Sequence, residues 1–256
     1  MIKTDLSGRV AMILGGETPF GRALAQAFSS CGANIALCHS PEACAEAVKA
    51  SIAACTTKAV AFAVDMNDQN AMEAARDQVV ECFGKIDILI NNTLHETADL
   101  ERVPMHAMDL EAYEGVITRT IKSVARLTHY VTQDMDKRKS GAVVNVFTVR
   151  GVTAVENQTA GVAAGGALVG LSRMWGVELK DSCIRCNGVA VGVLEGDPKL
   201  PSGDEYRFSH AAVQRPCTNE EAVAAVLFMA SDEASYITGT VLPVDGGITA
   251  GYARSF

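Results

Sequence analysis

Seven short runs of apolar residues recur along the chain, and each run is continuously apolar rather than alternating with polar positions. Runs of this kind are typical of strands that are covered on both faces, as in a parallel sheet. They predict strands at residues 9–15, 34–39, 59–65, 86–92, 141–147, 184–191 and 239–245.

Longer segments with helical spacing separate these runs, at residues 19–31, 41–54, 67–83, 109–137, 157–179 and 219–230. This alternation predicts an α/β fold, a three-layer doubly wound (Rossmann-type) sandwich with a seven-stranded parallel sheet. No linker or repeat divides the sequence, so residues 1–256 are expected to form a single domain. Within it, residues 193–217 are rich in Pro, Gly and Asp and predict a substrate loop or lid over the carboxyl edge of the sheet.

Composition limits the partners and the location. The net charge of -8 argues against a nucleic acid or an anionic membrane surface as partner. No apolar stretch has the length and position of a signal peptide or a membrane span. The eight cysteines follow no metal-ligand spacing, so no metal is expected, and they predict reduced thiols of a cytoplasmic protein.

The turn after the first predicted strand reads LGGETPFGRALA, with Gly15 and Gly21 at the entry to a helix. In a nucleotide-binding turn such glycines let the backbone approach a pyrophosphate, which the helix N-terminus attracts. Pro19 holds the middle position, where its ring takes up space and no N–H is available. Thr18 as N-cap and Pro19 at the first helical position would equally make a helix start that needs no ligand.

Five later segments extend the pattern over nearly the whole chain: VDMND, IDILINN, GAVVNVFTVRG, ELKDSCIRCNGVAVG and SDEASYITGTVLPVDGG. Together with the turn they resemble, in the right order, the motifs of the classical short-chain dehydrogenase/reductases, such as TGxxxGxG, DxLxNNAG and GxIVNxSSxxG. The resemblance implies a dinucleotide cofactor, NAD or NADP, and a dimer or tetramer.

The resemblance places the family's catalytic positions on residues of different chemistry. The serine falls on Thr148, which keeps a hydroxyl, and the asparagine of the proton relay falls on Thr120. The tyrosine and lysine fall on Gly161 and Gly165, which cannot deliver a proton. The chain is therefore identified as a divergent member that lacks the Tyr/Lys pair.

The implied cofactor site is only partly retained. Asp65 and Asn91, which in the family contact adenine and the adenosine ribose, are present, whereas Leu94 and Gly196 replace residues on the nicotinamide side. These changes and Pro19 predict that affinity for NAD or NADP is weak or absent. The end of the second strand leaves the choice between the two cofactors open. The expected cofactor-binding positions are Gly15, Pro19, Phe20, Gly21, His39, Asp65, Met66, Asn91 and Gly192.

Other side chains near the same cleft could replace the lost acid and base, although each has an ordinary role as a loop tip, a helix-end charge or a loop anchor. His95 with Glu156 is the pair that we would test first. The full set of candidates is His95, Glu96, Arg150, Glu156, Asn157, Tyr206 and His210.

Four glycines in residues 158–172, within the predicted helix at 157–179, would each cost roughly 0.5 to 1 kcal/mol relative to alanine. Lost chemistry explains Gly161 and Gly165, and close helix packing is the explanation left for Gly166 or Gly170. On this interpretation the substitutions Gly161→Tyr and Gly165→Lys should leave the fold intact.

Three functional interpretations remain open from the sequence. The main one is a family member without hydride-transfer catalysis, acting as a subunit or binding module, with a homo-oligomer or an active paralogous subunit as partner and an unknown small-molecule ligand. The first alternative is an NAD(P)-dependent oxidoreductase with an atypical active site. The second is a non-redox enzyme that carries out elimination or isomerisation in the altered cleft.

Overall fold

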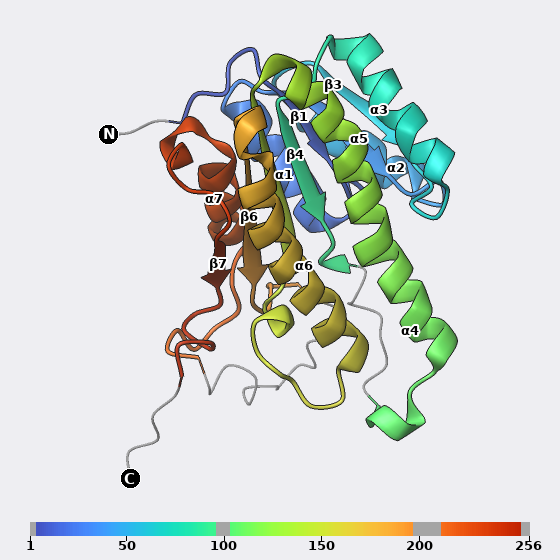
Figure 1. The fold of residues 1–256 in the computed structure, drawn as a ribbon, viewed down its shortest axis with the longest axis vertical. Helices are drawn as coiled ribbons and strands as arrows, with labels where there is room; N and C mark the ends of the chain where they lie inside the picture. The colour runs from blue at the N-terminus through green and yellow to red at the C-terminus, as the bar shows by residue number, and fades with distance from the viewer. Residues whose placement is uncertain (1–3, 96–102, 197–210, 252–256) are drawn as a thin grey trace.

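The computed structural model describes residues 4–95, 103–196 and 211–251 as a seven-stranded sheet between two layers of helices (Figure 1). The strand order is β3-β2-β1-β4-β5-β6-β7, and every neighbouring pair is parallel. The predicted fold class is therefore confirmed. The strands are β1 (Val10–Ile13), β2 (Asn34–His39), β3 (Ala59–Ala63), β4 (Ile88–Asn92), β5 (Gly141–Thr148), β6 (Ile184–Val191) and β7 (Val241–Val244).

The helices cover both faces of the sheet. On one face α1 packs against α2 and α7, and on the other α3 packs against α5, with α6 lying over β5 and β6 (Figure 1). Their bounds are α1 (Pro19–Ser30), α2 (Ala45–Ala53), α3 (Gln69–Phe83), α4 (Leu110–Ile117), α5 (Ser123–Arg138), α6 (Thr159–Glu178) and α7 (Asn219–Ala230). Every residue of β1 and β4 is buried, which explains why these strands are continuously apolar or amide-bearing.

The single helix predicted over residues 109–137 is interrupted. A π-helical turn, η3 (Thr118–Lys122), separates α4 from α5. Within it the Thr120 hydroxyl donates to the carbonyl of Val116 at 2.6 Å, and the Ser123 hydroxyl donates to the carbonyls of Thr118 and Arg119. Hydroxyl groups that compete for helical carbonyls favour such irregular turns, and a hydrophobic period does not reveal them.

Cys183 and Cys186, in the segment ELKDSCIRCNGVAVG, lie in different environments. Cys183 is exposed at a positive φ just before β6, whereas Cys186 is buried inside the strand. Burial raises the pKa of the Cys186 thiol to about 12, so the thiol stays protonated and unreactive. No helix among the described residues is both long enough and apolar enough to span a membrane.

The direction of strand addition reverses at β1, which has β2 on one side and β4 on the other. In open parallel sheets this reversal opens a crevice outside the carboxyl ends of the two flanking strands, because the connections diverge to opposite faces. The fold therefore places a ligand crevice beyond Ile13, His39 and Asn92.

Beneath this edge a buried network of polar side chains joins β4 and β5 to two helices. The Asn91 amide nitrogen donates to Asn145 Oδ1 at 2.8 Å and to Thr128 Oγ1 at 3.0 Å, and the Asn145 amide donates to Ser172 Oγ at 2.9 Å. All four side chains are buried. The network fixes α5 and α6 relative to the two strands that carry the crevice.

We predict that Asn145→Ala lowers the free energy of unfolding by about 2 to 3 kcal/mol, because it removes two buried hydrogen bonds, those with the Asn91 amide and the Ser172 hydroxyl, and leaves a cavity between them. Urea unfolding followed by circular dichroism measures the change. Asn70→Ala, at an exposed site on α3, is the matched control and should stay within about 0.5 kcal/mol of the unsubstituted protein. A loss below about 1 kcal/mol for Asn145→Ala would contradict the structural role of the network.

Candidate functional site

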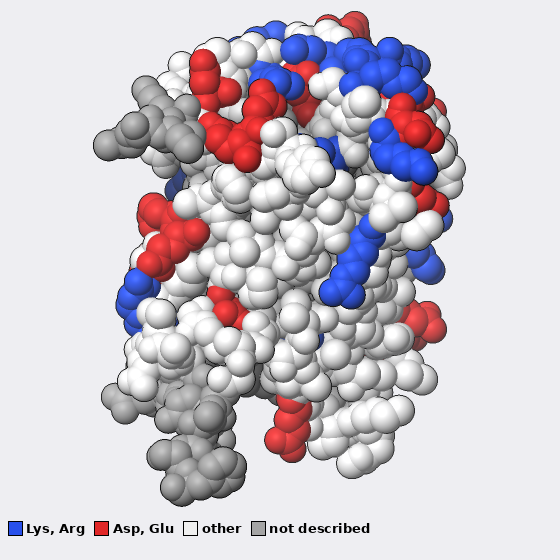
Figure 2. All heavy atoms as spheres, turned by 60° about the vertical axis from the view of Figure 1, so that its left-hand side comes forward, with Lys and Arg blue, Asp and Glu red and all other residues white. Residues whose placement is uncertain are grey.

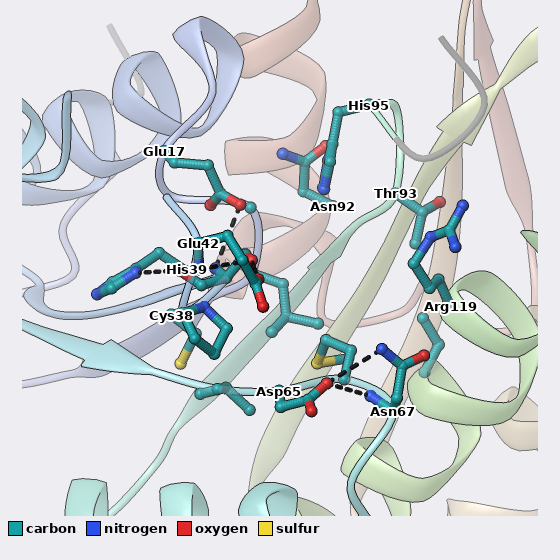
Figure 3. A pocket seen from close by; sticks show the side chains of 17 residues that line it. Glu17, Cys38, His39, Glu42, Asp65, Asn67, Asn92, Thr93, His95 and Arg119 are labelled. Carbon is teal, nitrogen blue, oxygen red and sulfur yellow. Dashed lines mark hydrogen bonds between the residues drawn. The ribbon is translucent and has the colours of Figure 1, made fainter. Parts of the chain in front are cut away.

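A pocket opens at the carboxyl edge of the sheet, in the crevice beside β1 (Figure 3). Its walls come from the ends of four strands and from the π-helical turn. The first turn contributes Gly15 and Glu17, the end of β2 contributes Cys38, His39, Ser40 and Glu42, the end of β3 contributes Asp65, Met66 and Asn67, the end of β4 contributes Asn92, Thr93 and His95, and η3 contributes Arg119.

The glycine-rich turn forms one wall and depends on close packing. Gly15 has a φ of 68°, and a Cβ atom there would lie 2.9 Å from both the Asn92 amide nitrogen and the His95 ring. A Cβ at Gly21 would overlap the carbonyl oxygen of Gly15. Thr18 caps α1, since its hydroxyl accepts from the Gly21 N–H at 2.9 Å and donates to the Gly15 carbonyl at 2.7 Å. Both glycines are therefore required by the fold of the turn itself.

Pro19 and Phe20 do not line the pocket. Pro19 is exposed at the first position of α1, and the Phe20 side chain is buried in the core with Leu24 and Phe28. The structure therefore gives no support for the expected narrowing of the cradle by Pro19, because this exposed residue is not among those that line the pocket.

Of the other expected cofactor positions, His39, Asp65 and Met66 line the pocket. Asp65 Oδ1 accepts from the backbone N–H of Asn67 at 2.8 Å and from its side-chain amide at 3.1 Å. The structure turns Asn91 away into the buried network, so that the following residue, Asn92, reaches the pocket instead.

Two further expected positions, Gly192 and Gly196, are not among the residues that line this pocket. Gly192 lines a second cleft together with Asp245 and Gly246, and a Cβ there would lie 3.1 Å from the Asp245 Cα. Gly196 has a φ of 74°, a conformation that favours glycine, and none of the described residues has an atom within 4 Å of a Cβ position there.

Thr148 ends β5 and is half-buried at the carboxyl edge. Its hydroxyl accepts from the backbone N–H of Arg150 at 3.5 Å, at the start of the short helix η4 (Val149–Gly151). Gly161 lies buried in the first turn of α6. The structure thus keeps one hydroxyl, that of Thr148, at the expected catalytic edge.

Gly165 packs directly against the backbone of Gly151. A Cβ atom at Gly165 would lie 2.6 Å from the Gly151 Cα and 2.8 Å from its nitrogen. By contrast, Gly166 and Gly170 are exposed, and a Cβ at either would meet nothing closer than 3.9 Å. The expectation that close packing explains only Gly166 or Gly170 is therefore wrong, and Gly165→Lys could not leave the fold intact.

Thr120 cannot relay protons to the cleft, because its buried side chain donates back to its own helix. The extra residue of the π-helical turn brings the neighbouring Arg119 to the pocket instead. Figure 3 shows the Arg119 guanidinium beside Thr93.

The expected replacement pair does not meet at the pocket. His95 follows β4 and lines the pocket beside Gly15, whereas Glu156 is exposed in the loop before α6 and is not among the lining residues. Arg150 and Asn157 lie in the same region as Glu156.

The candidates Glu96, Tyr206 and His210 lie outside the described residues, as do residues 197–210 of the expected lid. Within the described residues no cluster of three or more His, Cys, Asp or Glu could hold a metal ion.

Several polar pocket residues were missed from the sequence, among them Glu17, Asn67, Asn92 and Arg119. Glu17 lies inside the quoted glycine-rich turn, so a closer look at the variable positions of that turn could have found it. Asn92 and Arg119 are each one residue away from an expected position. A single-residue shift of this kind cannot be predicted from the sequence pattern, because it depends on the direction of the side chains at a strand end or in a π turn.

Comparison with known proteins gives consistent matches over the whole chain. A family model described as Enoyl-(Acyl carrier protein) reductase matches residues 17–249. The chain is similar to the 3-oxoacyl-[acyl-carrier-protein] reductase FabG of Thermotoga maritima, with 31% identity over 95% of this chain and 98% of that protein. A crystal structure of levodione reductase matches with a TM-score of 0.87 and 28% identity, over 96% of this chain and 100% of that one. Carveol dehydrogenase from Mycobacterium avium in complex with NAD shares the fold, with a TM-score of 0.89 and 24% identity over 97% of this chain and all of that chain.

These likenesses correct the main functional interpretation. The expectation of a non-catalytic subunit or binding module is wrong, because full-length relatives at up to 31% identity are named as reductases. The expected weak or absent affinity for NAD or NADP is likewise unsupported. The turn keeps its glycines, and Pro19 is not among the residues that line the pocket.

We predict that Gly165→Ala lowers the free energy of unfolding by about 1 to 3 kcal/mol, because the new methyl group must push α6 away from Gly151. Gly170→Ala is the matched control in the same helix, and it should stabilise the protein by roughly 0.5 to 1 kcal/mol. Chemical denaturation of both variants measures the two changes. Equal or higher stability of the Gly165→Ala variant would show that the contact with Gly151 is not required.

Proposed function

The chain belongs to the classical short-chain dehydrogenase/reductase family, and on that basis we propose that it is an NAD(P)-dependent oxidoreductase with an atypical active site. The observation that carries the proposal is the pocket in the crevice beside β1. It brings together the glycine-rich turn, Asp65 and Asn92 at the edge where such folds bind ligands.

The residues at this edge fit the adenosine half of a dinucleotide. Two buried polar atoms among the lining residues, Glu17 Oε2 and Asn92 Nδ2, have no hydrogen-bond partner within the described chain. One is an acceptor and the other a donor, and buried groups of this kind normally have partners. Asp65 is held in place by Asn67 and would lie near the adenine.

A bound nicotinamide would supply or accept the hydride. The residues of this chain would then hold the substrate oxygen and exchange its proton. We assign the holding role to the Thr148 hydroxyl, since it lies at the carboxyl end of β5 in the family's serine position. Arg119 adds a positive charge to the pocket, and a guanidinium can stabilise negative charge although it cannot release a proton.

We assign the proton exchange to His95. Glycine at 161 and 165 leaves no acid in the first two turns of α6, and imidazole is the side chain that titrates nearest to neutral pH. His95 lies on the β4 side of the pocket, next to Gly15. The substrate class that follows is a small carbonyl compound or the corresponding alcohol.

We also propose a homodimer or homotetramer. Exposed apolar side chains support it: Met174 and Val177 project from α6, and Phe228 and Tyr236 project from α7 and the segment after it. Charged side chains are sparse over the middle of the face shown in Figure 2.

We predict that Thr148→Val lowers kcat by roughly 10- to 100-fold for any carbonyl substrate that the protein reduces, because one hydrogen bond to the reacting oxygen is lost. The Kd of NADH or NADPH should change by less than about threefold. Stopped-flow or steady-state kinetics with calorimetric binding separates the two effects. Thr153→Val, in the loop before α6, is the matched control and should leave kcat unchanged. If both variants reduce substrate equally well, Thr148 has no catalytic role.

We predict that His95→Asn lowers kcat by roughly 10² to 10⁴ and abolishes the pH dependence of kcat between pH 5 and 8, since the proton-exchanging group is removed. A pH profile of turnover for the variant and for the exposed control His129→Asn measures this. An unchanged profile in the His95 variant would assign the proton exchange to another group.

A further inference from the structure

The choice between NAD and NADP rests on what surrounds the 2′ position of the adenosine ribose. In doubly wound folds this position lies past the end of the second strand, where a carboxylate accepts from the 2′-hydroxyl and a basic side chain pairs with the 2′-phosphate. Here β2 ends in His39, followed by Ser40, so neither group comes from the strand itself.

The structure brings a carboxylate to this place from a different element. Glu17 lies in the glycine-rich turn, and its Oε1 accepts from the backbone N–H of Ser40 at 3.3 Å. Figure 3 shows Glu17 reaching across from the turn toward the end of β2. The side chain thus bridges the two segments between which the adenosine ribose would lie.

The second oxygen of Glu17 is left without a protein donor. Oε2 is buried and has no hydrogen-bond partner among the described residues. A buried carboxylate oxygen without a donor loses much of its solvation free energy, so a hydroxyl donor from a ligand would be favoured there. A phosphate dianion in the same place would face an unshielded negative charge.

The neighbouring groups do not offset that charge. Glu42 also lines the pocket and accepts from the Ser40 hydroxyl, and His39 Nδ1 lies 2.7 Å from the Ser40 carbonyl and so donates to it. Among the described lining residues the only Lys or Arg is Arg119, which Figure 3 places on the opposite side of the pocket beside Thr93.

A separate effect of the Glu17 charge is seen at Cys38. The pKa of this thiol is raised to about 12, first by its burial and second by the nearby Glu17 carboxylate. The negative charge of the carboxylate disfavours formation of the thiolate anion, and by the same repulsion it would disfavour binding of a 2′-phosphate.

We propose that Glu17 makes this protein select NAD(H) over NADP(H), by accepting a hydrogen bond from the adenosine ribose and repelling a 2′-phosphate. This assignment rests on the proposed function, because it concerns the same cofactor pocket. In this proposal a residue of the glycine-rich turn takes the role that a carboxylate at the end of the second strand has in other doubly wound folds. The residues of β2 alone do not favour NAD over NADP.

The test compares the binding of NADH and NADPH to the full chain by isothermal titration calorimetry. ADP-ribose and its 2′-phosphate serve as probes that lack the nicotinamide. The unsubstituted protein should bind the non-phosphorylated member of each pair at least about 30-fold more tightly, as close like charges at a partly buried site require. Raising the salt concentration should narrow the difference, because exposed charges are screened.

Glu17→Gln removes the charge and keeps the oxygen that accepts from Ser40. It should narrow the NADH/NADPH affinity ratio by about tenfold, mainly through tighter binding of NADPH. Glu42→Gln is the matched control in the same pocket. Its side chain is exposed, so it should change the ratio by less than about threefold.

The outcomes distinguish a failure of the role assigned to Glu17 from a failure of the proposed oxidoreductase function. Equal binding of NADH and NADPH by the unsubstituted protein overturns the role of Glu17 and leaves the proposed function standing. A ratio that responds to Glu42→Gln but not to Glu17→Gln overturns it as well. Binding of neither dinucleotide overturns the proposed function and this assignment together. If Glu17→Gln does not fold, the affinity ratio and its salt dependence in the unsubstituted protein decide the matter.

Discussion

The backbone contact between Gly151 and Gly165 determines how closely α6 approaches the carboxyl end of β5. Neither residue could carry a Cβ atom without moving the other segment, and the Thr148 carbonyl lies only 3.5 Å from a Cβ position at Gly165. Two polypeptide backbones that meet this closely leave no room for a side chain between them. One wall of the expected catalytic cleft is therefore formed by main chain. The reactive group proposed for that wall is the Thr148 hydroxyl.

Most of the fold could be predicted from the sequence, because short, continuous apolar runs mark the strands and longer segments between them mark the helices. The strands at 34–39 and 184–191 and the helix at 219–230 begin and end where expected. The π turn at Thr118–Lys122 could not be predicted in this way. It depends on hydroxyl groups that bond to particular carbonyls, and such bonds leave no trace in the hydrophobic pattern.

The candidate site was only partly predictable. His39, Asp65 and His95 follow predicted strands and reach the pocket, as parallel strand ends should. Asn92 and Arg119 replace their neighbours, because one residue along a strand reverses the direction of a side chain and one residue along a helical turn rotates it by roughly 100°. Glu17 was not predictable for another reason, since the glycine spacing of the turn places no requirement on the side chain at this position.

The same geometry limits where the proton of the reaction can come from. Residues 161 and 165 lie one helical turn apart on one face of α6, so the close contact at Gly165 also brings the first turn of the helix near η4. A side chain at 165 would need α6 to withdraw from Gly151. The opposite wall has no such constraint, because the end of β4 already carries an imidazole at His95, and the π turn adds a guanidinium at Arg119. Since glycine at 161 and 165 supplies no acid on the α6 wall, the proposed proton exchange is assigned to the opposite wall of the cleft.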